Sequence, residues 1–492
     1  MAFQSNVQTD FSTAKKHHHH ASSMLSKTIS NVFWGIFSAT VLTLAFFYPS
    51  VPEWNLGTAI TINGFTLLIW ATVTFFGALV SSYATNYLQG FLYQAKFMWL
   101  CLGFTASVML LVSANHVLIL IASWFLMGFF MSKLIGADQD WGEAREASKF
   151  TQRYFLAGTL FLGVGLLVIA FELNTFLRDE MITQISSVPY YSLLIAALCI
   201  LTAAVIQSAI YPFHKWLLSA MTSPTPASAL MHAGFVNGSG IILALFASLI
   251  FTSNTQDVLL IIGGVTAIVA QFTKLIQVNV KQKLACSTIA QMGFMIMQCG
   301  LGFYNAAVVH LILHGFYKAY LFLASGEEIK HSAPKNIEQI TIKPLQIIAV
   351  LVFGTFAAYF FSFITGKGTH LDSGIFLTLI VAITVGQVTY NIVKEKSLSA
   401  VQKLIFPPVL FLCGIGAYGL MYNIVTTLMV DMPHTAQATP LSTLQIGFGI
   451  IFLVGFFIMK LGLYRKMPWL YVKLMNDSQP HKKTVLMYKS NS

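Results

Sequence analysis

The sequence predicts an all-α fold, a bundle of about fourteen helices that cross a membrane. Of its 492 residues, 56% are hydrophobic and only 9% are charged, whereas soluble domains carry about a quarter charged residues. The mean hydropathy of +0.72 agrees with this class. So few charges cannot cover a globular surface of this size. A soluble enzyme is therefore excluded, and a polytopic membrane protein is predicted.

Fourteen apolar runs follow one another from Asn31 onward. Each is long enough to cross the hydrocarbon core of a bilayer as a helix. The spans are expected near 31–48, 60–83, 95–112, 115–133, 154–172, 190–211, 224–250, 258–276, 284–303, 305–325, 345–365, 373–393, 404–428 and 442–463.

The basic residues support this count and set the orientation. With both termini in the cytoplasm, 25 of the 28 Lys and Arg residues fall on the cytoplasmic side, and the opposite loops hold only Arg178 and Lys367. Cytoplasmic loops of membrane proteins are enriched in these residues, which explains the net charge of +11 without nucleic acid. The sequence predicts a multi-pass protein of the cell membrane with a cytoplasmic N-terminal tail (1–30), a transmembrane domain (31–463) and a cytoplasmic C-terminal tail (464–492).

One predicted span contains several helix-breaking residues. Pro224 and Pro226 lie at its start, His232 follows, and Gly234 and Gly238 come next. Proline interrupts helices, and interrupted helices in membranes line cavities. We therefore expect a broken helix near 224–240 that faces a cavity. Close packing of small residues between helices is the alternative.

Three ionisable side chains share one face of a later span. His310, His314 and Lys318 are spaced at i, i+4 and i+8, which places them on a stripe about 12 Å long. Ionisable groups inside a bilayer are costly and persist where they face water or one another. Because histidine titrates near neutral pH, the stripe predicts a proton pathway. Structural hydrogen bonding between helices is the alternative.

His232 and Lys274 complete the predicted proton or cation pathway. Lys274 lies one turn before the end of its span, so its ammonium group could instead extend to the membrane surface. No Asp or Glu lies deep in any predicted span. The pathway would therefore be built from histidine and lysine, with water.

Motifs of soluble enzymes and electron carriers are missing from the sequence. It contains no Walker loop, no cysteine set for an iron–sulfur cluster and no haem-attachment motif, and its five cysteines lie singly in apolar stretches. We expect a transporter subunit rather than an enzyme, with no cofactor and no metal site in this chain.

Two segments resemble the antiporter-like subunits of respiratory complex I and of the Mrp cation/proton antiporters. The first runs over 212–233 and contains PFHKWL followed by PTPASALMHA, and the second is KLACSTIAQMG at 283–293. His310, His314 and Lys318 stand at the proton-channel positions of that family. The resemblance runs from about Trp124 to Gly326. It implies two inverted five-helix repeats and cation transport.

The chain departs from the family pattern at one ion pair. In complex I subunits a glutamate follows the family tryptophan and pairs with a lysine, whereas here Phe125 follows Trp124 and Gln207 stands at the lysine position. Losing both partners avoids an unpaired buried charge. The change puts conduction by that half of the pathway in doubt. It also favours, as an alternative, a membrane anchor that does not conduct.

Within that superfamily, the stretches HAGFVNGSG at 232–240 and AQMGFMIMQCGLG at 290–302 resemble the membrane subunits of DAB inorganic-carbon pumps. That resemblance implies a subunit whose proton or Na⁺ flux drives CO₂ hydration and bicarbonate accumulation by a DabA-like cytoplasmic zinc protein. The zinc would then be in the partner. The alternative is a proton-translocating subunit of a respiratory NADH dehydrogenase-like complex or of an Mrp-type antiporter.

The C-terminal segment is the expected docking site for that partner. Between Tyr464 and Ser492, lysines alternate with the apolar run 469–472. Such a mixture suits a protein interface as well as the membrane rim. We expect the partner to bind this segment and the basic loops near Lys281, Lys335 and Lys394, with contact to the lipid surface as the alternative.

Overall fold

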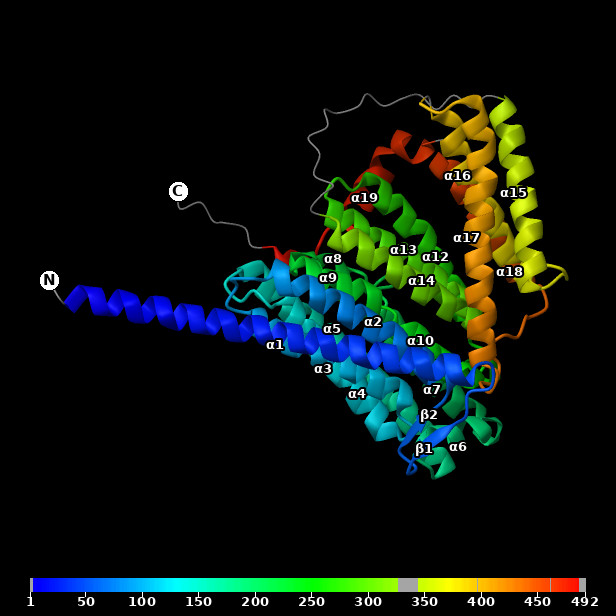
Figure 1. Cartoon of the computed structure of the whole chain (residues 1–492). Helices are drawn as coiled ribbons and strands as arrows, with labels where there is room; N and C mark the ends of the chain where they lie inside the picture. Colours follow the sequence, from blue (N-terminus) through cyan, green and yellow to red (C-terminus); the bar gives the residue numbers. More distant parts are fainter. Residues whose placement is uncertain (1–2, 326–343, 396, 461, 486–492) are drawn as a thin grey trace.

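The computed structural model describes residues 3–325, 344–395, 397–460 and 462–485, which form a bundle of long helices (Figure 1). The helices of the bundle are α1 (Phe3–Phe47), α2 (Gly64–Tyr87), α3 (Gln94–Ser113), α4 (Val117–Ile135), α5 (Gly142–Leu173), α7 (Tyr190–Gln207), α9 (Thr225–Leu230), α10 (Gly238–Leu245), α11 (Ala247–Thr252), α12 (Gln256–Ile276), α13 (Val280–Gly300), α14 (Tyr304–Leu323), α15 (Pro344–Thr365), α16 (Gly374–Lys394), α17 (Ala400–Leu428) and α18 (Thr443–Lys460). Short helices at their ends are α6 (Arg178–Thr183), η1 (Ile185–Ser187), α8 (Lys215–Ser219), η2 (Ala220–Thr222), η4 (Leu463–Lys466), α19 (Pro468–Asp477) and η5 (Lys482–Thr484).

The prediction of a polytopic all-α protein is confirmed. Each of the fourteen predicted runs coincides with helical structure, and twelve described helices are long and apolar enough to cross a membrane. The remaining two predicted spans are α13, which carries Lys281 and Lys283 in its first turns, and α18, whose apolar part is the shorter stretch Thr443–Gly455. The first span continues back into the expected N-terminal tail, because α1 is helical from Phe3 and extends beyond the bundle (Figure 1).

Loops predicted on the same side of the membrane contact one another. On the side with few basic residues, β1 (Trp54–Leu56) pairs with β2 (Ile60–Ile62). Isolated bridges join four further pairs there: Ile60 with Ala114, His116 with Leu177, Phe303 with Ala436, and Asp372 with Pro440. Arg178 is buried at this side and donates to the carbonyl of Ala114 at 3.0 Å. We call the opposite side, which carries the basic loops, the basic face.

The span from Thr225 onward is interrupted, but the prolines do not interrupt it. Pro224 caps the start of α9 and Pro226 lies in its first turn, where a missing N–H group costs nothing. The irregularity is a π-helical turn, η3 (Met231–Phe235), which is followed by α10. Such turns are frequent at functional sites, and this one contains His232.

The end of the chain folds back over the basic face. Residues 464–484, which we call the C-terminal strap, include α19 and η5. Tyr464 and Leu474 form a small apolar cluster with Ile276 at the end of α12. Figure 1 shows α19 close to the ends of α12 and α13, and η5 packs on α5. The predicted C-terminal tail is therefore part of the folded bundle up to residue 484.

Glycines allow α12 and α13 to approach closely. A Cβ atom on Gly293 would lie 2.7 Å from both the Gly263 carbonyl oxygen and the Ala267 nitrogen. These are backbone atoms, which cannot move aside as a flexible side chain can. The close pairing of the two helices therefore depends on the absence of a side chain at this position.

We expect Gly293→Ala to lower the unfolding free energy by about 1–3 kcal/mol, because the extra methyl overpacks a helix interface. Thermal unfolding of the detergent-purified protein measures this loss. Gly414→Ala is the matched control, since nothing lies within 4 Å of its Cβ position on α17. Equal melting temperatures for the two variants would contradict the predicted close packing.

Candidate proton pathway

The π-helical turn and α14 bring the predicted titratable residues together. His232 comes from η3, and His314 and Lys318 lie on the neighbouring α14. All three side chains are at most 5% exposed. His232 and Lys318 both act electrostatically on the His314 ring. Two segments that are about 80 residues apart in sequence thus form one buried cluster.

Lys318 is held by a backbone carbonyl rather than by a carboxylate. Its Nζ donates a hydrogen bond to the carbonyl oxygen of Leu284 at 2.9 Å. The ion pairs found among the described residues involve other lysine and arginine side chains. The predicted pathway residue Lys274, on α12, acts electrostatically on Lys318. The cluster is therefore cationic when its lysines are protonated.

The imidazole nitrogens of the cluster make no hydrogen bond to a described residue. Neither ring nitrogen of His232 or of His314 has a hydrogen-bond partner among the described residues. His232 instead stacks on Phe322, with ring centroids 4.3 Å apart. His310 lies one turn along α14, with its ring centroid 6.1 Å from that of His314. The stripe predicted from the spacing thus continues from His310 to Lys318.

Side chains from neighbouring helices hold the π-helical turn in place. Gln207 Nε2 donates to the carbonyl of Phe235 at 3.1 Å, and Ser208 Oγ donates to that of Val236 at 2.9 Å. Asn237 Nδ2 donates to the carbonyls of Ala233, at 2.7 Å, and Leu311, at 3.2 Å. Because a π-helical turn disturbs the regular ladder of backbone bonds, these donors keep η3 and its His232 fixed against α14.

The two positions that depart from the family pattern have separate surroundings. Gln207 is buried and donates to the η3 backbone. Phe125 is 38% exposed and stacks on Phe129. Both side chains are neutral, so this part of the bundle contains a fixed hydrogen bond between Gln207 and the η3 backbone.

A second set of polar groups leads from Lys318 to the basic face. Lys318 acts electrostatically on the Cys286 thiol. Thr273 lies near both Cys286 and Tyr211, and its hydroxyl donates to the carbonyl of Ala270 at 2.9 Å. The Tyr211 ring packs on His214 at 3.8 Å between centroids. Sequence analysis missed these residues because they come from three segments without a shared spacing. Only the folded structure places them together.

The C-terminal strap covers the outer end of this set. His214 Nε2 is 2.9 Å from the carbonyl oxygen of Asp477. The backbone N–H of His481 and the hydroxyl of Thr484 both donate to Ser219 Oγ at 3.0 Å. The His481 ring also stacks on Phe150 at 4.5 Å. The strap is therefore held by several specific bonds.

Three lysines mark the basic loops that are expected to bind a partner, and one of them makes a contact within the chain. Lys281 is engaged within the chain, because its Nζ donates to the carbonyl of Ser223 at 2.9 Å. Lys335 and the side chain of Lys394 lie outside the described residues.

Fold and site together define a multi-pass membrane protein with a buried histidine–lysine cluster. Residues 113–364 match the sequence profile described as NADH:quinone oxidoreductase/Mrp antiporter, transmembrane. This match covers about half of the chain, and the chain belongs to this family.

Curated proteins with similar sequences include inorganic carbon transporter subunits and a subunit of NADH-quinone oxidoreductase. The chain is 32% identical over 333 residues to the "Probable inorganic carbon transporter subunit DabB" of Bacillus anthracis, covering 66% of this chain and 64% of that protein. It is 29% identical to the protein of the same name from Hydrogenovibrio crunogenus, covering 62% and 60% of the two chains. It is 34% identical to NADH-quinone oxidoreductase subunit L of Escherichia coli, covering 57% and 46%. The chain thus aligns with less than two thirds of each relative.

Solved structures share the fold over nearly the whole chain. A chain of the Mrp complex from Dietzia superimposes with a TM-score of 0.62 at 20% identity, covering 93% of this chain and 57% of that chain. A chain of the archaeal membrane-bound sulfane sulfur reductase superimposes with a TM-score of 0.57 at 16% identity, covering 95% and 96%. At these identities the likeness establishes the fold.

We expect acidification to loosen the C-terminal strap. Burial lowers the pKa of His214, assisted by the charge of Lys215 and opposed by the Asp477 carbonyl. The pKa of His481 is also lowered, by desolvation and then by Lys215, Lys483 and Lys482. Since the released strap leaves both rings in water, the released state binds more protons below pH of about 6.5. The equilibrium constant for docking of the strap therefore decreases as the pH falls, by at most about tenfold per pH unit for each histidine.

Hydrogen exchange of residues 468–484 between pH 7.5 and 5, corrected for intrinsic exchange rates, measures strap release. The double variant His214→Gln/His481→Gln should flatten the pH dependence while the strap remains docked at pH 7.5. Protection that does not change with pH in the unsubstituted protein would contradict the prediction.

Proposed function

We propose that the chain is the membrane subunit of an energy-coupled inorganic carbon transporter. Protons move through it down their gradient, and this flux drives CO₂ hydration and bicarbonate accumulation by a DabA-like zinc protein on the basic face. The basic face is cytoplasmic in this proposal, and the bundle lies in the cell membrane. The chain itself carries neither the zinc nor another cofactor.

The observation that carries the proposal is the buried cluster of His232, His314 and Lys318. Among the described residues, four imidazole nitrogens have no hydrogen-bond partner, and the ammonium group that they adjoin has one carbonyl acceptor. Uncompensated polar groups in an apolar interior are costly, and ionisable groups at membrane depth mark ion pathways. A static structural role would instead be served by paired side chains.

The chemistry of the cluster favours protons over Na⁺. Hard cations bind to oxygen ligands, whereas the cluster offers imidazole nitrogens and an ammonium group. A protonated lysine would repel a metal cation. Histidine and lysine can each bind and release a proton, so the same groups that exclude Na⁺ can pass protons along.

The order of the groups defines a route. A proton from the side opposite the basic face reaches His310, passes to His314 and His232, and protonates Lys318. From there Cys286, Thr273, Tyr211 and bound water lead it towards His214 and the strap. The thiol and hydroxyl groups orient water along this part, and the histidines and lysine hold the charge.

The outer surface of the strap suits a protein partner. Trp469 is 67% exposed and Val472 is 56% exposed, while Leu470 and Leu474 on the same helix pack towards the bundle. An exposed tryptophan beside aliphatic and lysine side chains is typical of an interface centre. We therefore place the partner on the outer face of α19.

A second candidate function is a subunit of a respiratory or Mrp-type complex. The 34% identity to subunit L and the superposition on a chain of the Mrp complex favour it. The two candidates differ in their partners: several membrane subunits for the respiratory or Mrp-type complex, and one large soluble zinc protein for the carbon transporter.

Lys318→Ala should lower the proton flux by about 10²-fold or more, because alanine cannot take part in proton transfer. Proton flux is measured as the acidification reported by a pH-sensitive dye inside liposomes that contain the purified chain and its partner. Lys318→Arg should be as inactive, since arginine keeps the charge but does not release its proton. Lys149→Ala is the control, because that lysine is exposed and pairs only with Glu146. Full flux through folded Lys318→Ala would overturn the proposed pathway.

Trp469→Ala/Val472→Asp should abolish co-purification of a co-expressed DabA-like partner, because it replaces the apolar centre of the interface with a charge. The readout is the amount of partner and of zinc recovered with the tagged membrane chain. Leu371→Asp serves as control, since this exposed leucine lies in the loop opposite the basic face. Unchanged recovery with the double variant would place the contact elsewhere.

A further inference from the structure

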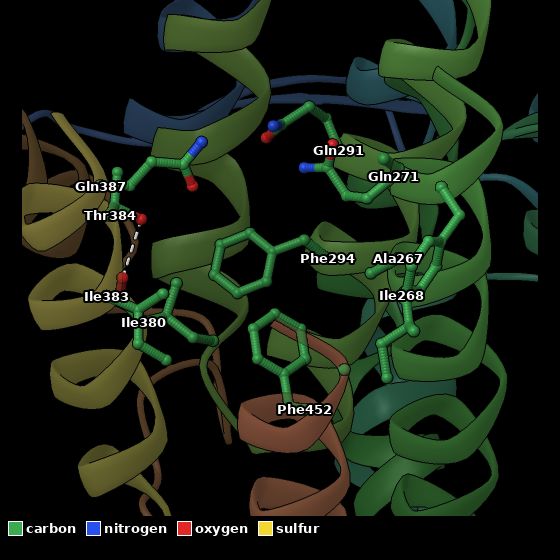
Figure 2. Close-up of a pocket in the computed structure, with 13 residues that line it drawn as sticks. Ala267, Ile268, Gln271, Gln291, Phe294, Ile380, Ile383, Thr384, Gln387 and Phe452 are labelled. Atoms are coloured by element: carbon green, nitrogen blue, oxygen red, sulfur yellow. Dashed lines mark hydrogen bonds between the residues drawn. The ribbon is translucent and has the colours of Figure 1, made fainter. Parts of the chain in front are cut away.

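A polar crevice lies on the other side of α13 from the histidine–lysine cluster. A cavity of about 250 Å³, open on one side, is lined by residues of α12, α13, α16 and α18 (Figure 2). Its wall is mostly apolar, but Gln271, Gln291 and Gln387 from three different helices line it. Figure 2 shows their carboxamide groups at one end of the cavity and the rings of Phe294 and Phe452 beyond them.

The three glutamine side chains are only partly buried, so their carboxamides are open to molecules that enter the cavity. None of them donates to or accepts from another described residue, whereas Thr384, which also lines the cavity, is satisfied by the carbonyl of Ile380 at 2.8 Å. Amides without hydrogen-bond partners are costly in apolar surroundings. Three of them around one cavity therefore point to an occupant that both donates and accepts hydrogen bonds.

Their depths form a series from the basic face inward. Gln271 and Gln387 lie five and seven residues before the ends of α12 and α16, or about 8 and 11 Å at 1.5 Å per residue. Gln291 lies eleven residues into α13, or about 17 Å from the basic face. The carboxamides thus reach from near this face to the middle of the bundle.

Phe294 separates the crevice from the histidine stripe. It lies one turn beyond Gln291 on α13 and also lines the cavity. The ring centroids of Phe294 and His310 are 5.3 Å apart. Those of His310 and His314 are 6.1 Å apart. A phenyl ring carries no exchangeable proton, so in this position it interrupts an otherwise polar connection.

We propose that the crevice holds a column of water that gives His310 a second access to the basic face, with Phe294 as the barrier between them. The proposal rests on the proposed proton conduction. It adds a route that reaches His310 without passing Lys318. The glutamines orient the water through both donor and acceptor atoms, and their neutrality avoids trapping a proton on the way. Rotation of the Phe294 ring would open the connection.

The first test measures water in the crevice independently of proton flux. Gln291→Cys and Gln387→Cys are introduced into a chain that keeps Cys286 but lacks the other four cysteines, and labelling by a membrane-impermeant charged maleimide is compared with that of this parent chain. Reaction needs a thiolate and hence water. Both positions should be labelled, whereas the control Val388→Cys, adjacent on α16 but 41% exposed on the bundle surface, should not. Labelling of the glutamine positions only by a lipid-soluble maleimide would mean a lipid occupant and would overturn the proposal.

The second test measures the barrier. Phe294→Ala combined with Lys318→Ala should recover several-fold more flux than Lys318→Ala alone, because the crevice then supplies His310 directly. Phe452→Ala with Lys318→Ala is the matched control: this ring also lines the cavity, and the described contacts of His310 are with Phe294 and His314. No recovery with Phe294→Ala would overturn the role of the ring. Flux retained by Lys318→Ala itself would instead overturn the proposed function, while the labelling still reports on the water.

Discussion

A buried lysine that has no carboxylate partner in the part of the chain the structure describes is the constraint on which the rest of this structure depends. The ammonium group of Lys318 has one backbone carbonyl as acceptor, and Lys274 acts on it electrostatically. Such a group is stable inside a membrane protein only where the surroundings supply polar atoms and water. The π-helical turn, with His232 held against α14, and the polar groups from Cys286 to His214 provide these surroundings.

A neutral hydrogen bond between Gln207 and η3 leaves one part of the bundle without an ionisable group. Gln207 holds the η3 backbone, and Phe125 lies partly exposed on the bundle surface. The region between them is fixed in one protonation state. The titratable groups of the histidine–lysine cluster lie instead on α14 and the neighbouring η3. The glutamine crevice adjoins this same helix through Phe294.

Sequence patterns predicted the spans and the stripe well, because both depend on local spacing. Apolar length predicted α1 to α18, alternating basic loops separated the two faces, and the i, i+4, i+8 spacing placed His310, His314 and Lys318 on one helix face. Contacts between distant segments could not be predicted in this way. The approach of His232 to His314, the docking of His481 on Ser219, and the position of Gln271 and Gln387 around one cavity all require the packed fold. The prediction that Pro224 and Pro226 break the helix was wrong, because the effect of a proline depends on whether it lies at the start of a helix or in its interior.

The return of the strap to α5 and α8 has a consequence for biosynthesis. The chain emerges from the ribosome N-terminus first, and domains generally form in that order. The histidine–lysine cluster is complete once α14 has been made, but the segment that covers its outer end is translated only after four more helices have followed. Each nascent chain therefore passes through a stage in which the pathway is assembled and its cover is not. On the proposed function, slow insertion of α15 to α18 would expose the cell to a transient proton leak during synthesis.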